Sequence, residues 1–413
     1  PWGIEVVLDP LSAFTASAVA VVATLALLAA GPGAARLYGG AVPVFYALVL
    51  IALTGYLGII ASGDMFNVFV FLEIAAIASY ALVASGGGAA LAAAFRYIVL
   101  GTVGASFYLI GVGLLYALTG SLNMADLAAR LPGLSGSPLF LGAVVFVVVG
   151  LAIKMGLFPL HGWLPDAYTH APSPVVGFLS AVGTKAFAYA IARMLFWVLR
   201  PADIPVGTIL AWTGAAAVVA GGVLALRQAD ARRLLAYSSV SQLGYIALGL
   251  GLGTPAALAG AYLLVLSHAA AKGALFVAVG AALLRGGRPE VGALGFGRGM
   301  PVTSACAVVA ALSLVGVPPT GGFFSKWYLL RGSFEAGQPL LVVVIIAGSL
   351  LAVVYCYRLT ESVWFGDAAP AAREAPASVV VGLVALAVLA VAVGLASETI
   401  VERVLLAAAA GGS

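Results

Sequence analysis

Charged residues are scarce in this chain. They make up 8% of its 413 residues, while hydrophobic residues make up 63%. A typical soluble domain carries about 25% charged residues. A soluble fold of this size could not cover so apolar a chain with polar surface. The scarcity excludes the soluble globular class and indicates a protein of the lipid bilayer.

Several chemical signatures are absent as well. The only cysteines, Cys306 and Cys356, lie in apolar segments and are interpreted as packing residues. The sequence has no metal-ligand cluster, iron–sulfur pattern, phosphate-binding glycine loop or nucleophile triad. It also has no basic run for nucleic acid and no cleavable signal peptide. We therefore expect no cofactor, no metal site, no nucleic-acid partner and no catalysis by this chain alone.

Apolar runs long enough to cross a bilayer, which takes about 20 residues each, recur along the chain. All of them should be helices, because an open chain in lipid must satisfy its own backbone hydrogen bonds. The sequence predicts an all-α integral membrane protein with about twelve spans, at 11–30, 41–62, 65–84, 94–118, 138–170, 174–199, 206–226, 235–253, 257–284, 301–333, 340–360 and 378–396.

Arginines predict the orientation. If the loop around Arg227, Arg232 and Arg233 is cytoplasmic, alternation of the spans places eight arginines inside and three outside. The positive-inside rule then puts both termini on the outer face of a prokaryotic cytoplasmic membrane.

Two predicted spans are interrupted by proline and glycine, at 158–162 and at 318–322. They are the fifth and the tenth spans, so they cross in opposite directions. This pattern predicts two inverted repeats, 41–200 and 201–366, between an N-terminal helix at 1–40 and a C-terminal helix and tail at 367–413. Simple packing kinks are the alternative.

Lysine and arginine occur in different parts of the sequence. All four lysines lie inside apolar spans, whereas eleven of the fifteen arginines lie in loops or tails. A buried lysine can give up its proton and an arginine cannot. Ionisable groups at the bilayer centre cost roughly 2.5–3.5 kcal/mol each, so they should face a polar interior and have a function. The candidate proton carriers of the first half are Glu73, Lys154 and Lys185, and those of the second are His268, Lys272 and Lys326.

Glu73 is the one acid deep in a span, and we expect it to control the proton affinity of Lys154. A static ion pair is the alternative. His268 and Lys272 are four residues apart and share a helix face, which favours a proton relay. His161 and His170 are interpreted mainly as capping groups near the first break, with a proton entrance as the alternative.

The motifs resemble those of a known family. Residues 63–74 (GDMFNVFVFLEI) resemble the acidic helix of Mrp-type cation/proton antiporters, their D-type subunit in particular. Residues 154–167 (KMGLFPLHGWLPDA) and 171–175 (APSPV) resemble a broken helix shared with antiporter-like subunits of respiratory complex I and membrane-bound hydrogenases. Residues 233–245 (RLLAYSSVSQLGY), 268–272 (HAAAK) and 321–326 (GGFFSK) fit as well.

The resemblance implies a fourteen-helix fold with two inverted five-helix repeats. Relative to that fold the first two helices are missing here, and the chain starts at Pro1 rather than at Met, which fits a sequence that begins inside a longer natural chain. It also implies a proton path from Glu73 and Lys154 through Lys185, His268 and Lys272 to Lys326, and partner membrane subunits. One departure is the stretch Pro165–His170, which is closer to the complex I and hydrogenase branch than to the D-type antiporter subunit.

Three hypotheses follow. The first is a subunit of a multisubunit sodium/proton antiporter, coupling protons to Na⁺. The second is a proton-pumping subunit of a redox-driven complex of the NADH:quinone oxidoreductase or hydrogenase type. The third is a membrane scaffold, which the lysine distribution disfavours.

Overall fold

The computed structural model describes residues 4–134, 136–201, 204–366 and 373–406, and its regular elements are helical throughout. Residues 367–372, at the predicted start of the C-terminal segment, lie outside these ranges. The α-helices are α1 (Pro10–Tyr38), α2 (Val42–Ala61), α3 (Met65–Ala84), α4 (Ala89–Thr119), α5 (Met124–Arg130), α6 (Pro138–Met155), α7 (Leu164–His170), α8 (Ser173–Arg193), α9 (Val206–Leu226), α10 (Ala231–Leu252), α11 (Pro255–Leu284), α12 (Pro301–Val315), α13 (Gly321–Glu335), α14 (Pro339–Phe365), α15 (Ala377–Leu395) and α16 (Ser397–Ile400). The short elements are η1 (Gly39–Ala41), η2 (Leu131–Leu134), and the π-helical turns η3 (Met194–Leu199) and η4 (Val401–Leu406).

Ten helical stretches of the described chain are long and apolar enough to cross a membrane, which makes this a multi-pass membrane protein. The predicted number of twelve differs for two reasons. First, α1, η1 and α2 form one continuous apolar stretch, Pro10–Ala61. Second, α12 and α13 have only 15 residues each, too few to span alone, since about 20 are needed.

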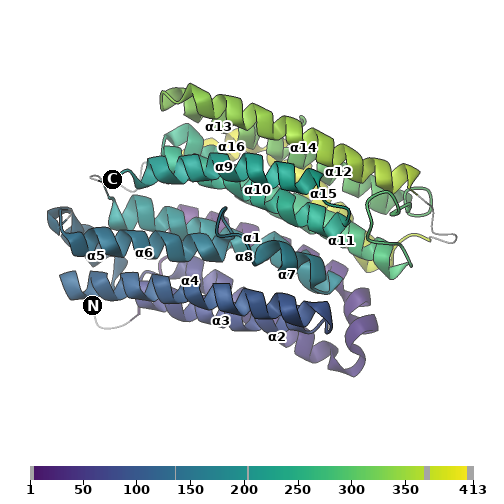
Figure 1. Cartoon of the computed structure of the whole chain (residues 1–413), viewed down its shortest axis with the longest axis horizontal. Coiled ribbons are helices and arrows are strands. Elements are labelled where there is room, and N and C mark those ends of the chain that lie inside the picture. The colour runs from purple at the N-terminus through teal and green to yellow at the C-terminus, as the bar shows by residue number, and fades with distance from the viewer. Residues whose placement is uncertain (1–3, 135, 202–203, 367–372, 407–413) are drawn as a thin grey trace.

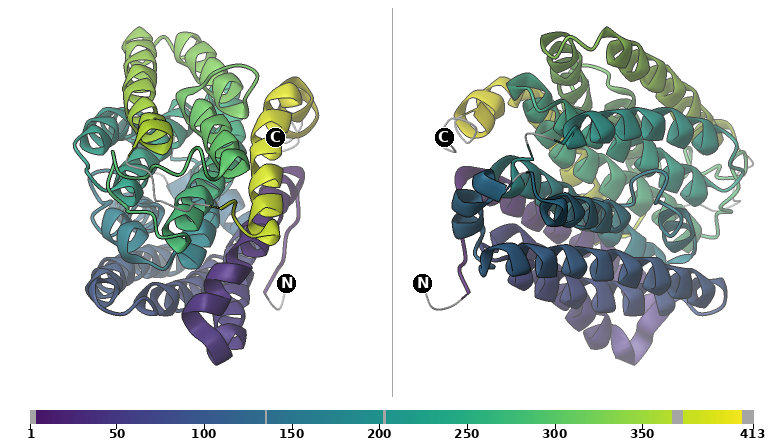
Figure 2. Two further views of the ribbon diagram at one scale, coloured as in Figure 1. Left: turned by 90° about the vertical axis from the view of Figure 1, so that its right-hand side faces the viewer. Right: turned by 60° about the vertical axis from the view of Figure 1, so that its left-hand side comes forward.

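The helices lie side by side with their axes roughly aligned (Figure 1). In that view α2, α3 and α4 form the lower part of the bundle, α6 lies at mid-height beside α8, and α9, α13 and α14 form the upper part. Helix α15 packs along α1, so helices from the two ends of the chain are neighbours (Figure 2). Helices α8 and α11 form the centre, where the most apolar part of each is completely covered by neighbouring helices.

Glycines let two pairs of helices approach closely. A Cβ atom added to Gly150 on α6 would lie 2.6 Å from the carbonyl oxygen of Gly104 on α4. A Cβ atom added to Gly244 on α10 would lie 2.6 Å from the carbonyl oxygen of Gly214 on α9. Small residues at such crossings are typical of membrane helices, whose association depends on close packing.

Both predicted breaks are present. The first separates α6 from α7 and contains a cis Phe158–Pro159 bond. The second separates α12 from α13 and contains a cis Pro318–Pro319 bond. Each break starts with a glycine in a left-handed conformation, Gly156 at φ +76° and Gly316 at φ +90°. Glycine suits these positions because a side chain would strain such a backbone.

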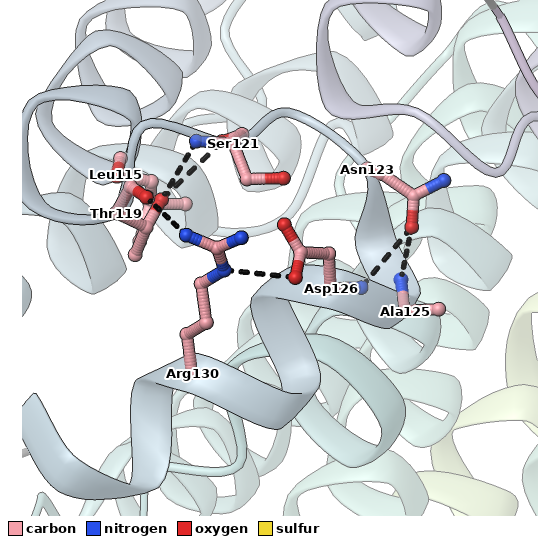
Figure 3. Close-up of polar contacts among 7 residues, drawn as sticks. All are labelled: Leu115, Thr119, Ser121, Asn123, Ala125, Asp126 and Arg130. Carbon is pink, nitrogen blue, oxygen red and sulfur yellow. Dashed lines mark hydrogen bonds and ion pairs between the residues drawn. The ribbon is translucent and has the colours of Figure 1, made fainter. Parts of the chain in front are cut away.

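Hydrogen bonds hold residues 119–130, in the polar connection between the fourth and fifth predicted spans (Figure 3). Asn123 caps α5 by accepting from the backbone N–H groups of Ala125 and Asp126, at 3.0 and 3.1 Å. The Arg130 side chain donates to Asp126 at 2.8 Å and to the Thr119 carbonyl at 2.9 Å. These contacts fix a short helix where the sequence indicated only a loop.

Candidate functional site

The first break places a lysine beside a glutamate. Lys154 lies in the last turn of α6, and its Nζ is 3.5 Å from Oε1 of Glu73 on α3. The same Nζ lies 3.3 Å from the Tyr80 hydroxyl, to which it donates. The Lys154 side chain is 2% exposed and that of Glu73 is 31% exposed. The predicted Glu73–Lys154 pair is therefore present, with the amine enclosed and the carboxylate at the edge of the packed interior.

The segment after the first break is fixed from both halves of the chain. Trp163 donates from Nε1 to the Ile153 carbonyl at 2.8 Å, which ties the break back to α6. Asp166 on α7 pairs with Arg96 of α4 and, at 3.1 Å, with Arg233 of α10. One buried carboxylate thus joins the short helix α7 to a helix of each half. The sequence did not indicate this contact, since both arginines are far from Asp166 in the chain.

The two histidines near this break have separate surroundings. The His161 ring lies 6.2 Å from that of Tyr237, in an edge-to-face arrangement. His170 ends α7 and lines a cavity at the same end of the bundle. Within the described ranges, the hydrogen bonds and ion pairs of the buried lysines involve neither histidine.

The second break also places a lysine at a helix end. Lys326, on the second turn of α13, donates from Nζ to the carbonyl oxygens of Leu314 and Val315, each at 2.9 Å. These carbonyls end α12, where the break leaves them without helical partners. The Nζ also lies 4.8 Å from the centre of the Tyr245 ring. A cation is stabilised at such a helix C-terminus. Lys154 differs, because it lies before its break, in the last turn of α6, and its Nζ contacts Glu73 and Tyr80.

The other three predicted groups lie on the central helices. Lys185 of α8 donates to the Ser180 carbonyl of its own helix. Lys272 of α11 donates to the Leu235 carbonyl of α10 at 2.7 Å and to the Ser238 hydroxyl. The two lysines are close enough to interact electrostatically, and both lysines interact with His268.

His268 is 1% exposed, and neither of its ring nitrogens has a hydrogen-bond partner among the described residues. A buried polar group in this state calls for an explanation, such as a role in catalysis or transport or a bound water. His268 shares α11 with Lys272, four residues away, and lies within electrostatic range of both Lys185 and Lys272.

A cluster of tyrosines was missed by the reasoning from sequence. Tyr80 packs edge-to-face on Tyr97 with ring centres 4.6 Å apart. The Tyr56 hydroxyl lies 2.8 Å from that of Ser79 and interacts with Tyr97 and Tyr168. This cluster extends from the Tyr80 contact with Lys154 toward the start of α8. Tyrosines inside apolar spans, whose hydroxyls need buried partners, were the available signal.

Cys356 also has a position that the sequence could not show. It was interpreted as a packing residue, and the thiol is indeed buried and free. It lies within electrostatic range of both Lys272 and Lys326, the two lysines of the second half. In the described part of the chain, no three His, Cys, Asp or Glu side chains group closely enough to hold a metal ion.

Comparisons with known proteins agree with this geometry. The chain is 48% identical to NADH-quinone oxidoreductase subunit N of Desulforudis audaxviator, over 98% of this chain and 84% of that protein. It is 32% identical to the D subunit of a Na⁺/H⁺ antiporter of Bacillus subtilis, over 78% of this chain and 66% of that one.

The fold has solved counterparts. The chain matches one in the structure of the Mrp complex from Dietzia sp. DQ12-45-1b with a TM-score of 0.88 and 28% identity, covering 99% of this chain and 84% of that one. The family model described as "NADH:quinone oxidoreductase/Mrp antiporter, TM" matches residues 62–352. With its two broken helices, its buried lysines and these matches, the chain belongs to the NADH:quinone oxidoreductase/Mrp antiporter family of membrane proteins.

Proposed function

We propose that this chain is the proton-translocating, antiporter-like subunit of a redox-driven membrane complex of the NADH:quinone oxidoreductase type. The observation that carries this choice is the 48% identity to an NADH-quinone oxidoreductase subunit N over 98% of the chain, against 32% for the D subunit of an antiporter. Of the two functional hypotheses, the redox-driven one is thus better supported than the Mrp-type antiporter.

The proposed path follows the buried ionisable groups. Glu73 controls the proton affinity of Lys154, which exchanges with Lys185. Lys185 exchanges with His268 and Lys272, and Lys326 is the terminal carrier of the second half. We infer that internal water completes the connections, because buried polar groups without protein partners usually bind water.

The contacts of the amines support this role. Lys185, Lys272 and Lys326 donate to backbone carbonyls or a hydroxyl, and no carboxylate is among their described partners. A carbonyl oxygen can accept a hydrogen bond from a charged ammonium or from a neutral amine. These contacts therefore survive the loss of a proton, whereas a tight carboxylate pair would hold the proton on the lysine.

The topology belongs to the same proposal. Segments 41–200 and 201–366 are the two inverted repeats, flanked by 1–40 and 367–413, and each repeat carries one break. Both termini lie on the outer face of a prokaryotic cytoplasmic membrane. Partner membrane subunits supply the redox chemistry, and this chain supplies the proton path.

The second candidate is the Mrp-type sodium/proton antiporter subunit. It is supported by the match to the Mrp complex chain at a TM-score of 0.88. The fold alone does not separate the two candidates, because both kinds of protein lie within one family.

The test uses the complex purified through an affinity tag on this chain and reconstituted in liposomes. We expect flavin and iron–sulfur subunits in the preparation, and proton movement driven by NADH and quinone that a pH-sensitive dye reports. The Lys154→Ala variant should assemble and lose this movement, whereas Arg331→Ala, which removes an exposed surface cation, should keep it. Proton movement driven only by a Na⁺ gradient, without redox subunits, would contradict the proposal and favour the second candidate.

A further inference from the structure

A cavity of about 400 Å³, with cationic side chains in a partly apolar wall, opens at the arginine-rich end of the bundle. Its wall comes from the end of α1, the turn between α7 and α8, and the ends of α10 and α11. Arg36, His170 and Arg232 line it, and no acidic residue is among its described lining residues. None of these groups belongs to the proton path proposed above, which runs through Glu73, the four lysines and His268.

The cations that line it have unused hydrogen-bonding capacity. Arg36 donates from Nη1 to the Leu284 carbonyl at 2.5 Å, one of five donors on its guanidinium. The buried Nε of Arg232 has no hydrogen-bond partner among the described residues. Arg232 interacts electrostatically with Asp230, whose carboxylate also caps α10 by accepting from the Arg233 backbone N–H at 2.9 Å.

A helix end adds to the positive potential. Helix α8 begins at Ser173, in the wall of the cavity, and the positive end of its dipole favours an anion. Pro174 has no N–H, and the N–H groups of Val175 and Val176 donate to the Pro172 carbonyl, so the Ser173 N–H is the backbone donor that this helix start offers. Two arginines, a histidine and a helix N-terminus thus face one space. This combination selects a compact anion that accepts several hydrogen bonds, and a phosphate group fits that description.

An apolar hollow continues from the cavity. It shares Gly33, Pro174 and Leu284 with the cavity and runs along α1 past Ala30 to Ala26. From Gly33 to Ala26 this is about 10 Å toward the middle of the helix, at about 1.5 Å per residue. The hollow is narrow, about 20 Å³, so it admits only the first carbons of a chain.

We propose that this cavity binds the phosphate of an anionic phospholipid headgroup, with Arg36 and Arg232 as its ligands. Basic pockets between membrane helices bind such headgroups, and each arginine near the membrane surface contributes about fivefold in affinity. The adjoining apolar hollow favours a lipid over a soluble phosphate, because it admits the first carbons of a lipid chain. The proposal does not depend on the redox complex, and it holds for either candidate function.

The test is native mass spectrometry of the full chain in detergent, titrated with phosphatidylglycerol, phosphatidylcholine and glycerol 3-phosphate. We expect phosphatidylglycerol to bind, and Arg36→Gln and Arg232→Gln each to weaken it about fivefold, with a roughly 25-fold loss in the double variant. Arg288→Gln, an exposed arginine at the same end outside the cavity, is the matched control. If Arg232→Gln folds poorly, Arg232→Lys takes its place in the test. It keeps the positive charge of this half-buried residue and should retain most of the affinity for phosphatidylglycerol.

Three results would overturn the proposal. One is phosphatidylglycerol binding that is equal in the double variant and in Arg288→Gln. A second is equal binding of phosphatidylcholine, which would mean that the negative charge is not recognised. A third is glycerol 3-phosphate binding with the same affinity as phosphatidylglycerol, which would assign the cavity to a soluble phosphate ester.

Discussion

Replacing Glu73 with Gln removes the only carboxylate within ion-pair distance of Lys154 among the described residues. At the observed 3.5 Å, two unit charges attract by about 5 kcal/mol at an effective dielectric constant of about 20. Measured losses on breaking buried pairs are about 3–5 kcal/mol. Because the Glu73 side chain is 31% exposed and the pair is not fully enclosed, we expect the free energy of unfolding to fall by about 3 kcal/mol, the lower end of that range.

The consequence for transport should be larger than the consequence for folding. In the proposed path Glu73 controls the proton affinity of Lys154, so without the carboxylate we expect proton movement in reconstituted liposomes to fall at least tenfold. The matched control is Glu335→Gln, which breaks a surface pair between Glu335 and Arg331 worth about 0–1 kcal/mol. Proton movement at the wild-type rate in Glu73→Gln, with the complex assembled, would refute the assigned role of the pair.

Three further substitutions test the proton path and the helix packing. Lys326→Arg should assemble but lose proton movement, because a guanidinium does not release its proton; a normal dye response would show that proton release there is unnecessary. Tyr80→Phe removes the hydroxyl that lies 3.3 Å from the Nζ of Lys154. It should slow proton movement and lower the free energy of unfolding by about 1 kcal/mol, whereas unchanged proton movement would exclude Tyr80 from the path. Gly150→Ala should lower the unfolding temperature, because its Cβ would lie 2.6 Å from a carbonyl oxygen of α4. The control is Gly113→Ala, whose Cβ would meet no atom within 4 Å. Equal unfolding temperatures of the two variants would contradict the close packing of α4 and α6.

The sequence predicts well those features that depend on neighbouring residues. The two breaks follow from proline and glycine, whose backbone chemistry is local. The burial of the four lysines follows from the apolar runs around them. His268 and Lys272 are four residues apart, and this spacing predicts that they lie on the same face of one helix.

Other features depend on contacts between distant segments, which spacing does not encode. Asp166 lies 70 residues from Arg96 and 67 from Arg233, yet its carboxylate contacts both. The electrostatic interaction of Cys356 on α14 with Lys272 on α11 and Lys326 on α13 likewise needs three helices in place. The short helix α5 was missed because its stability comes from capping by Asn123 and from the Arg130 contacts, while it has only seven residues.

The most direct measurement of the proposed proton path is a structure of the assembled complex in lipid at a resolution that shows ordered water. We predict water molecules that join Lys154 to Lys185, occupy the unpaired nitrogens of His268, and continue past Lys272 to Lys326. A dry, closely packed interior between these side chains, in a complex that moves protons, would contradict this path.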